Sequence, residues 1–110
     1  MGTYWLVMEI TVEQFLNEWD SKRHYVMVDI REPSELQKDG KISGTVDIPM
    51  KTIPRNLSTF DKDTAYVIMC AGGGRSLRVT EYLQKSGFDK AVSLAGGFHT
   101  LKLVAPQMVE

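Results

Sequence analysis

Apolar stretches of strand length alternate with helical patterns along this chain, and that alternation constrains the fold more than any other feature. The runs Tyr25–Ile30 and Ala65–Met69 are nearly continuous, which is typical of strands covered on both faces. Tyr4–Met8, Thr45–Ile48 and Ala91–Leu94 are further strand candidates. Strands that alternate with helices form a largely parallel sheet between helical layers. The sequence therefore predicts an α/β sandwich.

Helices are expected between these strands. Thr11 begins the first one, because Gln14 stands three residues later as in a capping box and an apolar face follows at helical spacing. Pro33 suits the first turn of a short helix that ends near Gly40. The remaining expected elements are a weak helix or irregular connection over Ile53–Phe60, a helix closed by Gly87, and a terminal helix around Phe98–Val104.

Composition limits the function classes. Residues 1–110 are expected to form a single domain, with 43% hydrophobic residues and no linker or low-complexity tract. A net charge of -1 without a dense basic run argues against nucleic acid as a partner. No stretch approaches the roughly 18 apolar residues of a membrane span, and no signal peptide is recognisable. The single cysteine excludes an internal disulfide, and a reactive thiol suits a reducing compartment, so the cytoplasm is the expected location.

The only cysteine, Cys70, stands between an apolar run and a glycine-rich segment that leads into a helical pattern. Gly72, Gly73 and Gly74 allow successive N–H groups to turn inward around one point, beside the positive end of a helix. Arg75 adds a cation to the same pocket. Both influences are expected to lower the thiol pKa from about 8.5 toward or below neutrality. The alternative is a small buried hydrophobic residue, but such a residue needs no run of glycines.

Cys70 is expected at the carboxyl end of its strand, where open α/β sheets bind ligands. Sulfur transfer, phosphate-monoester hydrolysis and thiol redox exchange all use a cysteine in such a cradle. The cysteine phosphatases have a Cys-x5-Arg loop, whereas Arg75 makes this one Cys-x4-Arg and Ser76 occupies the phosphatase position. The smaller radius suits a single extra sulfur better than a phosphate. Gly73 stands where a Cys-x-x-Cys redox motif needs its second cysteine.

Four segments then follow one another at a specific spacing: Val28–Arg31 with Glu35, Gly40–Pro49, Cys70–Ser76 and Leu94–Phe98. In these segments the chain resembles the single-domain rhodaneses, or thiosulfate sulfurtransferases. The resemblance implies a three-layer sandwich with a central, mostly parallel five-stranded sheet flanked by helices. Two positions depart from the family pattern: Lys41 replaces the usual His, and Leu101 replaces a Trp that commonly follows the two glycines. Both are interpreted as structural positions.

The resemblance also implies an activity. Cys70 takes a sulfane sulfur from a small anion such as thiosulfate, holds it as a persulfide and passes it to cyanide, a thiol or a sulfur-accepting protein. Arg75 is expected to hold the departing sulfite, and the N–H groups of the loop are expected to surround the outer sulfur. Those N–H groups belong to Ala71, Gly72, Gly73, Gly74, Arg75 and Ser76. No cofactor is implied, and the two histidines lack the spacing of a metal site.

Three side chains near the expected site have structural interpretations. Capping of the following helix is the favoured role of the Ser76 side chain, because serine is common at helix starts. Asp29 and Arg31 are expected to be structural, with Arg31 pairing with Glu32 or Glu35.

Two other function classes are alternatives. A non-catalytic rhodanese-like module that docks a partner is disfavoured because it would not need Cys70 and Arg75. A cysteine phosphatase or arsenate reductase of related fold is disfavoured by the short loop.

Overall fold

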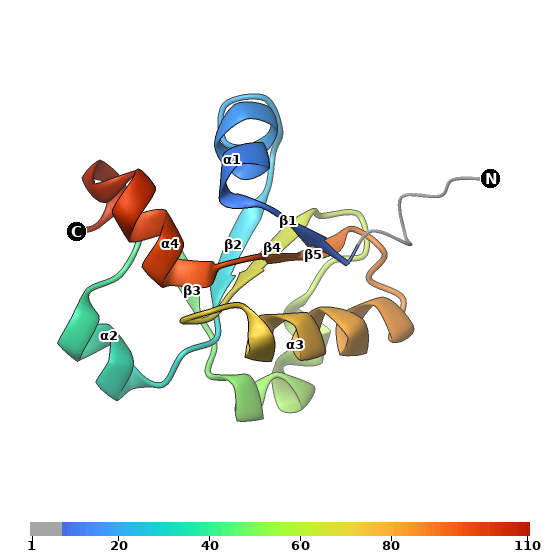
Figure 1. Ribbon diagram of the computed structural model, residues 1–110. Helices are drawn as coiled ribbons and strands as arrows, with labels where there is room; N and C mark the ends of the chain where they lie inside the picture. The colour runs from blue at the N-terminus through green and yellow to red at the C-terminus, as the bar shows by residue number, and fades with distance from the viewer. Residues whose placement is uncertain (1–7) are drawn as a thin grey trace.

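The computed structural model describes residues 8–110 and shows a five-stranded sheet between two layers of helices (Figure 1). Each neighbouring pair of strands is parallel, and the strands lie in the order β1-β5-β4-β2-β3. They are β1 (Glu9–Ile10), β2 (Val26–Asp29), β3 (Val46–Asp47), β4 (Tyr66–Met69) and β5 (Ala91–Leu94). The predicted α/β sandwich with a parallel sheet is confirmed.

The first strand differs from its predicted position. Most of Tyr4–Met8 lies outside the described residues, and β1 comprises Glu9 and Ile10, immediately after that run. Parallel pairing with β5 places Ile10 beside Leu94, and the Ile10 side chain is buried in the core. The sheet therefore extends to the residue just before Thr11, the N-cap of the first helix.

The helices begin near their predicted positions. Thr11 caps α1 (Val12–Gln14), since its Oγ1 accepts from the N–H of Gln14 at 3.0 Å and the Gln14 side chain accepts from the N–H of Thr11 at 2.9 Å. A π-helical segment follows directly over Phe15–Trp19. The others are α2 (Pro33–Asp39), short 3-10 helices over Met50–Thr52, Pro54–Thr59 and Pro106–Met108, α3 (Gly74–Lys85) and α4 (Gly97–Val104).

Side chains of the central strand β4 alternate between the two layers. Val67 and Met69 join the core beneath α1 and α4, whereas Tyr66 and Ile68 join the core beneath α3. Figure 1 shows α1 and α4 on one side of the sheet and α3 on the other. Because successive strand residues face opposite sides, Cys70 belongs to the α3 side, and its side chain is part of that core.

A buried ion pair ties the end of β2 to two helices. Arg31 donates to the Asp29 carboxylate at 2.8 Å and to the carbonyl oxygen of Gly40, after α2, at 3.0 Å. Its guanidinium carbon also lies 3.8 Å from the centre of the Phe98 ring on α4. The predicted pairing of Arg31 with Glu32 or Glu35 is wrong. Side chains two apart on an extended backbone point the same way, so Asp29 is the nearer partner.

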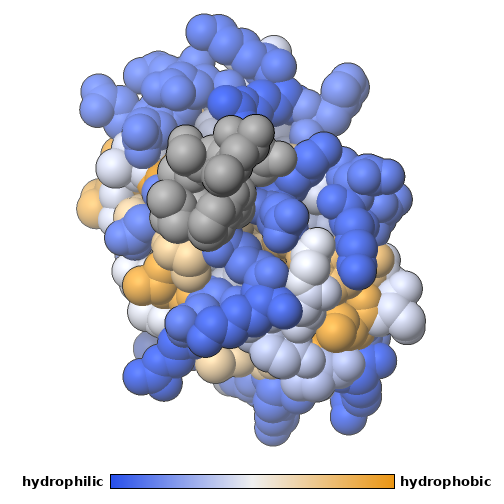
Figure 2. Space-filling view, turned by 90° about the vertical axis from the view of Figure 1, so that its right-hand side faces the viewer, coloured by the Kyte–Doolittle hydropathy of each residue, from blue (hydrophilic) through white to orange (hydrophobic). Residues whose placement is uncertain are grey.

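Apolar side chains are exposed at several separate places on the surface. Among residues 8–110, no helix is both long and apolar enough to cross a membrane. On the face shown in Figure 2, hydrophilic residues predominate and hydrophobic residues form separate small patches. Leu103 and Val104, near the end of α4, have the largest exposed fractions of the described large apolar side chains, 83% and 57%.

Candidate active site

The end of β4 delivers Cys70 to the carboxyl edge of the sheet. Residues 71–73 then turn the chain into α3, which begins at Gly74. Only 1% of the Cys70 surface is exposed, so the thiol lies at the bottom of this turn. The predicted site residues from Cys70 to Ser76 therefore occupy one loop and the first helical turn.

Two backbone N–H groups point at the sulfur atom. The N–H of Gly73 donates to Cys70 Sγ at 3.0 Å, and the N–H of Ser76 donates to it at 3.3 Å. The hydroxyl oxygen of Ser76 lies 3.4 Å from the same sulfur. These contacts surround the sulfur with donors on the side of the helix N-terminus, where negative charge is stabilised.

These contacts change the acidity of the thiol. Burial raises the pKa of Cys70, but hydrogen bonds from the Ser76 side chain and from the N–H groups of Ser76, Gly73 and Gly72 lower it more, so the pKa lies below its ordinary value. The predicted direction is confirmed. Hydrogen bonds are the largest lowering influence, and the charge of Arg75 also interacts with the Cys70 thiolate.

The three loop glycines are not equivalent. Gly73 has φ +111°, in the left-handed region, and a Cβ there would lie 3.2 Å from the backbone nitrogen of Gly96. Gly72 and Gly74 lie outside the left-handed region, and a Cβ on either would meet nothing within 4 Å. Backbone geometry thus requires glycine at Gly73 alone of these three positions.

The Ser76 side chain is turned inward. The predicted capping role is wrong, because Gly73 is the N-cap of α3 and no side chain caps this helix. Ser76 is the third residue of α3, so its hydroxyl faces the sheet, donating to the carbonyl of Gly73 at 3.1 Å and lying 2.7 Å from Ser93 Oγ on β5. The helix simply begins earlier than glycine propensity suggests, since Gly74 is already helical.

Arg75 forms a bidentate ion pair with Glu35 on α2. Its two terminal nitrogens donate to the two carboxylate oxygens, each at 2.8 Å. The hydrogen bond from Arg75 is the largest influence that lowers the pKa of Glu35 to about 2. Glu35 in turn raises the pKa of Arg75. The loop cation that the sequence predicts is thus present, but a carboxylate neutralises it.

The turn at Gly96 and Gly97 packs against the active loop, and the two residues that follow it form hydrogen bonds with the loop backbone. The N–H of Phe98 donates to the Cys70 carbonyl at 2.8 Å, and the N–H of His99 donates to the Ala71 carbonyl at 3.1 Å. Gly97 has φ +60°, and a Cβ there would collide with both carbonyl oxygens. The close approach of the two backbones explains why glycine stands at this position.

Sequence reasoning missed three contributors to this site, namely Glu35, Ser93 and Gly97. The sequence places Glu35 in a resembling segment and offers it as a partner for Arg31, and it places Gly97 in a double-glycine turn, but it connects neither residue with Cys70. Each comes from an element far along the chain from Cys70, and local spacing carries no signal of such contacts. The double glycine was the one local clue, because left-handed turns favour that residue.

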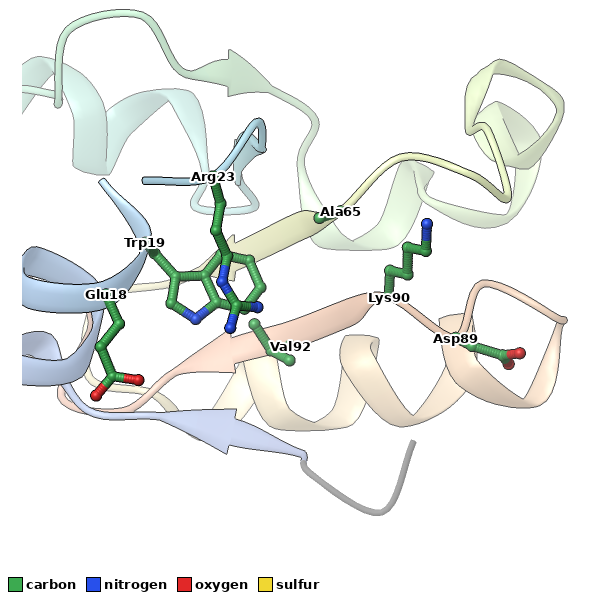
Figure 3. A pocket seen from close by; sticks show the side chains of 7 residues that line it. All are labelled: Glu18, Trp19, Arg23, Ala65, Asp89, Lys90 and Val92. Atoms are coloured by element: carbon green, nitrogen blue, oxygen red, sulfur yellow. The ribbon is translucent and has the colours of Figure 1, made fainter. Parts of the chain in front are cut away.

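A cavity of about 450 Å³ lies elsewhere (Figure 3). Ala65 and Lys90, which line it, immediately precede β4 and β5, so it lies near the amino ends of these strands. Arg23 stacks over the ring of Trp19 there, with 4.6 Å between the guanidinium carbon and the ring centre. Neither Cys70 nor its loop borders this cavity, so it is separate from the candidate site.

Known proteins share this architecture. Residues 11–103 match the family of rhodanese-like domains. A sulfurtransferase from Allochromatium vinosum is 34% identical over 107 residues, which cover 93% of this chain and 99% of that protein. A thiosulfate sulfurtransferase from Tolumonas auensis is 31% identical over 80 residues, covering 73% of this chain and 74% of that protein. The crystal structure of a rhodanese-like domain protein from Staphylococcus aureus, 39% identical, has a TM-score of 0.77 and covers 86% of this chain and 91% of that one.

Proposed function

This chain belongs to the rhodanese-like domain family, and we propose that it moves a sulfane sulfur from a small anionic donor to a thiophilic acceptor through a persulfide on Cys70. The observation that carries this proposal is the pair of N–H groups, from Gly73 and Ser76, directed at Cys70 Sγ. They favour the thiolate, which is the nucleophilic form of cysteine. The sulfurtransferases at 31% and 34% identity support the same reaction class.

With thiosulfate as donor, the first step forms the persulfide. The Cys70 thiolate attacks the outer sulfur, a new S–S bond forms, and the S–S bond of thiosulfate breaks. Sulfite leaves with the electron pair, and Cys70 carries a terminal sulfur with one negative charge. Because the leaving group is already an anion, the step needs neither an external acid nor a cofactor.

The second step transfers the outer sulfur to the acceptor and regenerates the Cys70 thiolate. Cyanide or a thiol attacks the outer sulfur and takes it, and the bond to Cys70 breaks with its electron pair on Sγ. Cyanide becomes thiocyanate, and a thiolate becomes a persulfide anion. A sulfur-accepting protein would react in the same way through a nucleophile of its own.

A low-pKa thiol that must stay reduced suits the cytoplasm, which is the proposed location.

Residues of the loop have distinct parts in this proposal. The N–H groups of Ala71, Gly72, Gly73, Gly74, Arg75 and Ser76 would stabilise the outer sulfur of the persulfide in the manner of an oxyanion hole. The outer sulfur of that persulfide extends beyond Sγ, away from the buried end of β4. Arg75 would border the donor and the leaving sulfite, with its charge moderated by Glu35.

Intact mass spectrometry after exposure to thiosulfate tests the proposal. We expect a gain of one sulfur atom, reversal by cyanide with formation of thiocyanate, and no gain for Cys70→Ser. If the wild-type protein gains no sulfur from any sulfane donor, the docking module is favoured instead. Hydrolysis of an aryl phosphate without sulfur uptake would favour the phosphatase alternative.

A further inference from the structure

The ion pair between Arg75 and Glu35 determines the charge that a donor meets near Cys70. Both terminal nitrogens of Arg75 are committed to the carboxylate of Glu35, at 2.8 Å each. The side chains are 36% and 28% exposed, so the pair borders the solvent from which a donor arrives. A guanidinium that would otherwise attract anions is therefore neutralised where it stands.

Other negative charges near Arg75 further reduce its attraction for an anionic donor. Besides Glu35, the strongest charges that act on Arg75 are those of the Cys70 thiolate and Glu32, and both are negative. Arg31 also acts on Glu35, but it is itself paired with Asp29 at 2.8 Å. A donor with two negative charges thus approaches a thiolate without a free cation from Arg75 to offset the repulsion.

Glu35 is held in this position by its own helix. Its Oε2 accepts from the N–H of Glu32 at 2.8 Å, which forms half of the capping box at the start of α2. Its pKa of about 2 keeps it ionised at any pH at which a sulfurtransferase would be assayed. The neutralising charge is consequently a permanent feature of the site.

We propose that Glu35 sets the donor class of this enzyme by favouring sulfane-sulfur donors with a single negative charge over dianionic thiosulfate. This inference rests on the proposed function. An alkylthiosulfonate, such as methanethiosulfonate, reacts by the same step. The thiolate of Cys70 takes the outer sulfur, the S–S bond of the donor breaks, and methanesulfinate leaves with the electron pair. This donor differs from thiosulfate by a methyl group in place of one charged oxygen.

The test compares kcat/KM for thiosulfate and methanethiosulfonate in the wild type and in Glu35→Gln. Glutamine also suits the third position of a capping box, so the substitution removes the charge and keeps the helix start. We expect the ratio of thiosulfate to methanethiosulfonate kcat/KM to rise roughly threefold to tenfold, because one extra charge is attracted by the released Arg75. Glu81→Gln is the matched control, since Glu81 pairs with Lys85 on the exposed face of α3 and should leave the ratio unchanged.

A second variant tests whether Arg75 causes the rise in the kcat/KM ratio. In the double variant Glu35→Gln, Arg75→Gln the rise in the ratio should disappear, because no cation remains to be released. Ionic strength gives an independent measurement on the wild type. Added inert salt should leave thiosulfate kcat/KM unchanged or raise it, whereas in Glu35→Gln added salt should lower it.

Several outcomes would overturn the inference. A ratio unchanged in Glu35→Gln, a rise that persists in the double variant, or a wild-type thiosulfate rate that falls with salt would each exclude Glu35 as the determinant. Failure of the proposed function looks different, since neither donor would then add sulfur to Cys70 by intact mass. A wild-type thiosulfate rate that falls with salt excludes the inference even if the variants fold poorly.

Discussion

At the scale of single residues, one hydroxyl proton governs the environment of Cys70. Ser76 has one proton and three neighbours that can accept it: Cys70 Sγ at 3.4 Å, the Gly73 carbonyl at 3.1 Å and Ser93 Oγ at 2.7 Å. The buried hydroxyl of Ser93 can itself donate to Ser76 Oγ. With Ser93 as the donor, the Ser76 proton is shared only between the Gly73 carbonyl and the thiolate. Ser93 is thus a positioning residue for a donor that lowers the pKa of Cys70.

Replacing Ser93 should therefore make Cys70 less acidic. In Ser93→Ala the Ser76 proton is no longer oriented, so we expect the pKa of Cys70 to rise by about half a unit to one unit. Because a higher pKa means that the thiolate forms at higher pH, the pH curve of sulfur uptake should shift toward alkaline pH. Ultraviolet titration of the thiolate measures the shift.

Thr80→Ala is the control for this substitution. Like Ser93 on β5, Thr80 on α3 is a fully buried residue with a hydroxyl group, but its Oγ1 has no hydrogen-bond partner among the described residues. Its removal should leave the titration of Cys70 unchanged. An equal shift in both variants would mean that loosened packing, rather than the hydroxyl of Ser93, moves the pKa.

At the scale of elements, the active loop is held by the turn that precedes α4. Gly97→Ala should weaken this contact, since the new methyl group would collide with the carbonyl oxygens of Cys70 and Ala71 and since φ is +60°. We expect a loss of roughly 1–3 kcal/mol in unfolding free energy from the strained backbone, together with a fall in kcat for sulfur transfer. Chemical denaturation and cyanolysis assays measure the two effects.

Gly74→Ala provides the contrast within the same loop. Gly74 is already helical, and a Cβ there meets nothing within 4 Å. The substitution should stabilise α3 by about 0.5–1 kcal/mol and preserve sulfur transfer. Loss of activity comparable to that of Gly97→Ala would indicate that the loop needs glycine for approach of the donor and not for backbone conformation.

The length of the loop defines the distances between its donors and the sulfur. One glycine inserted between Gly73 and Gly74 should widen the ring, because the N–H groups at 3.0 and 3.3 Å from Sγ could no longer both reach it. We expect sulfur transfer to fall and binding of vanadate or phosphate to rise. Cyanolysis and vanadate titration measure the two changes. An insertion variant that folds, retains full activity and binds no oxyanion better would show that loop radius does not select the substrate.

At the scale of the whole molecule, the pair of Asp29 and Arg31 links the sheet to α2 and α4. Arg31→Met should destabilise the protein by about 3–5 kcal/mol, because it leaves the Asp29 carboxylate buried without its partner. Lys41→Met is the matched control. The bond from Lys41 to Asp47 is also 2.8 Å long, but its side chains are 28% and 36% exposed, so its loss should cost less than about 1 kcal/mol.

Thermal and denaturant unfolding of the two variants measure this difference. Equal losses would show that burial does not distinguish the two pairs. The two departures from the family pattern lie in different surroundings, since Lys41 belongs to this exposed pair and Leu101 is fully buried in the core. Their interpretation as structural positions stays a prediction.

The sequence by itself determined the features that arise from neighbours along the chain. Apolar runs and helical spacing predicted the α/β sandwich, and Thr11 with Gln14 predicted a capping box that the structure contains. The order of strand, cysteine, glycines and helix predicted a cradle at the carboxyl end of a strand. These predictions succeed because strand alternation, capping and tight turns depend on residues only a few positions apart.

Only the tertiary structure decided which residues from distant parts of the chain contact Cys70 and its loop. Glu35 reaches Arg75 from 40 residues away, and Ser93 reaches Ser76 from 17 residues away. The parallel order of the strands brings β5 beside β4, and the buried Arg31 holds the end of β2 near α4. The charge beside the site and the orientation of its hydroxyl proton are therefore set by packing, because electrostatics and hydrogen bonds depend on distance in space rather than along the chain.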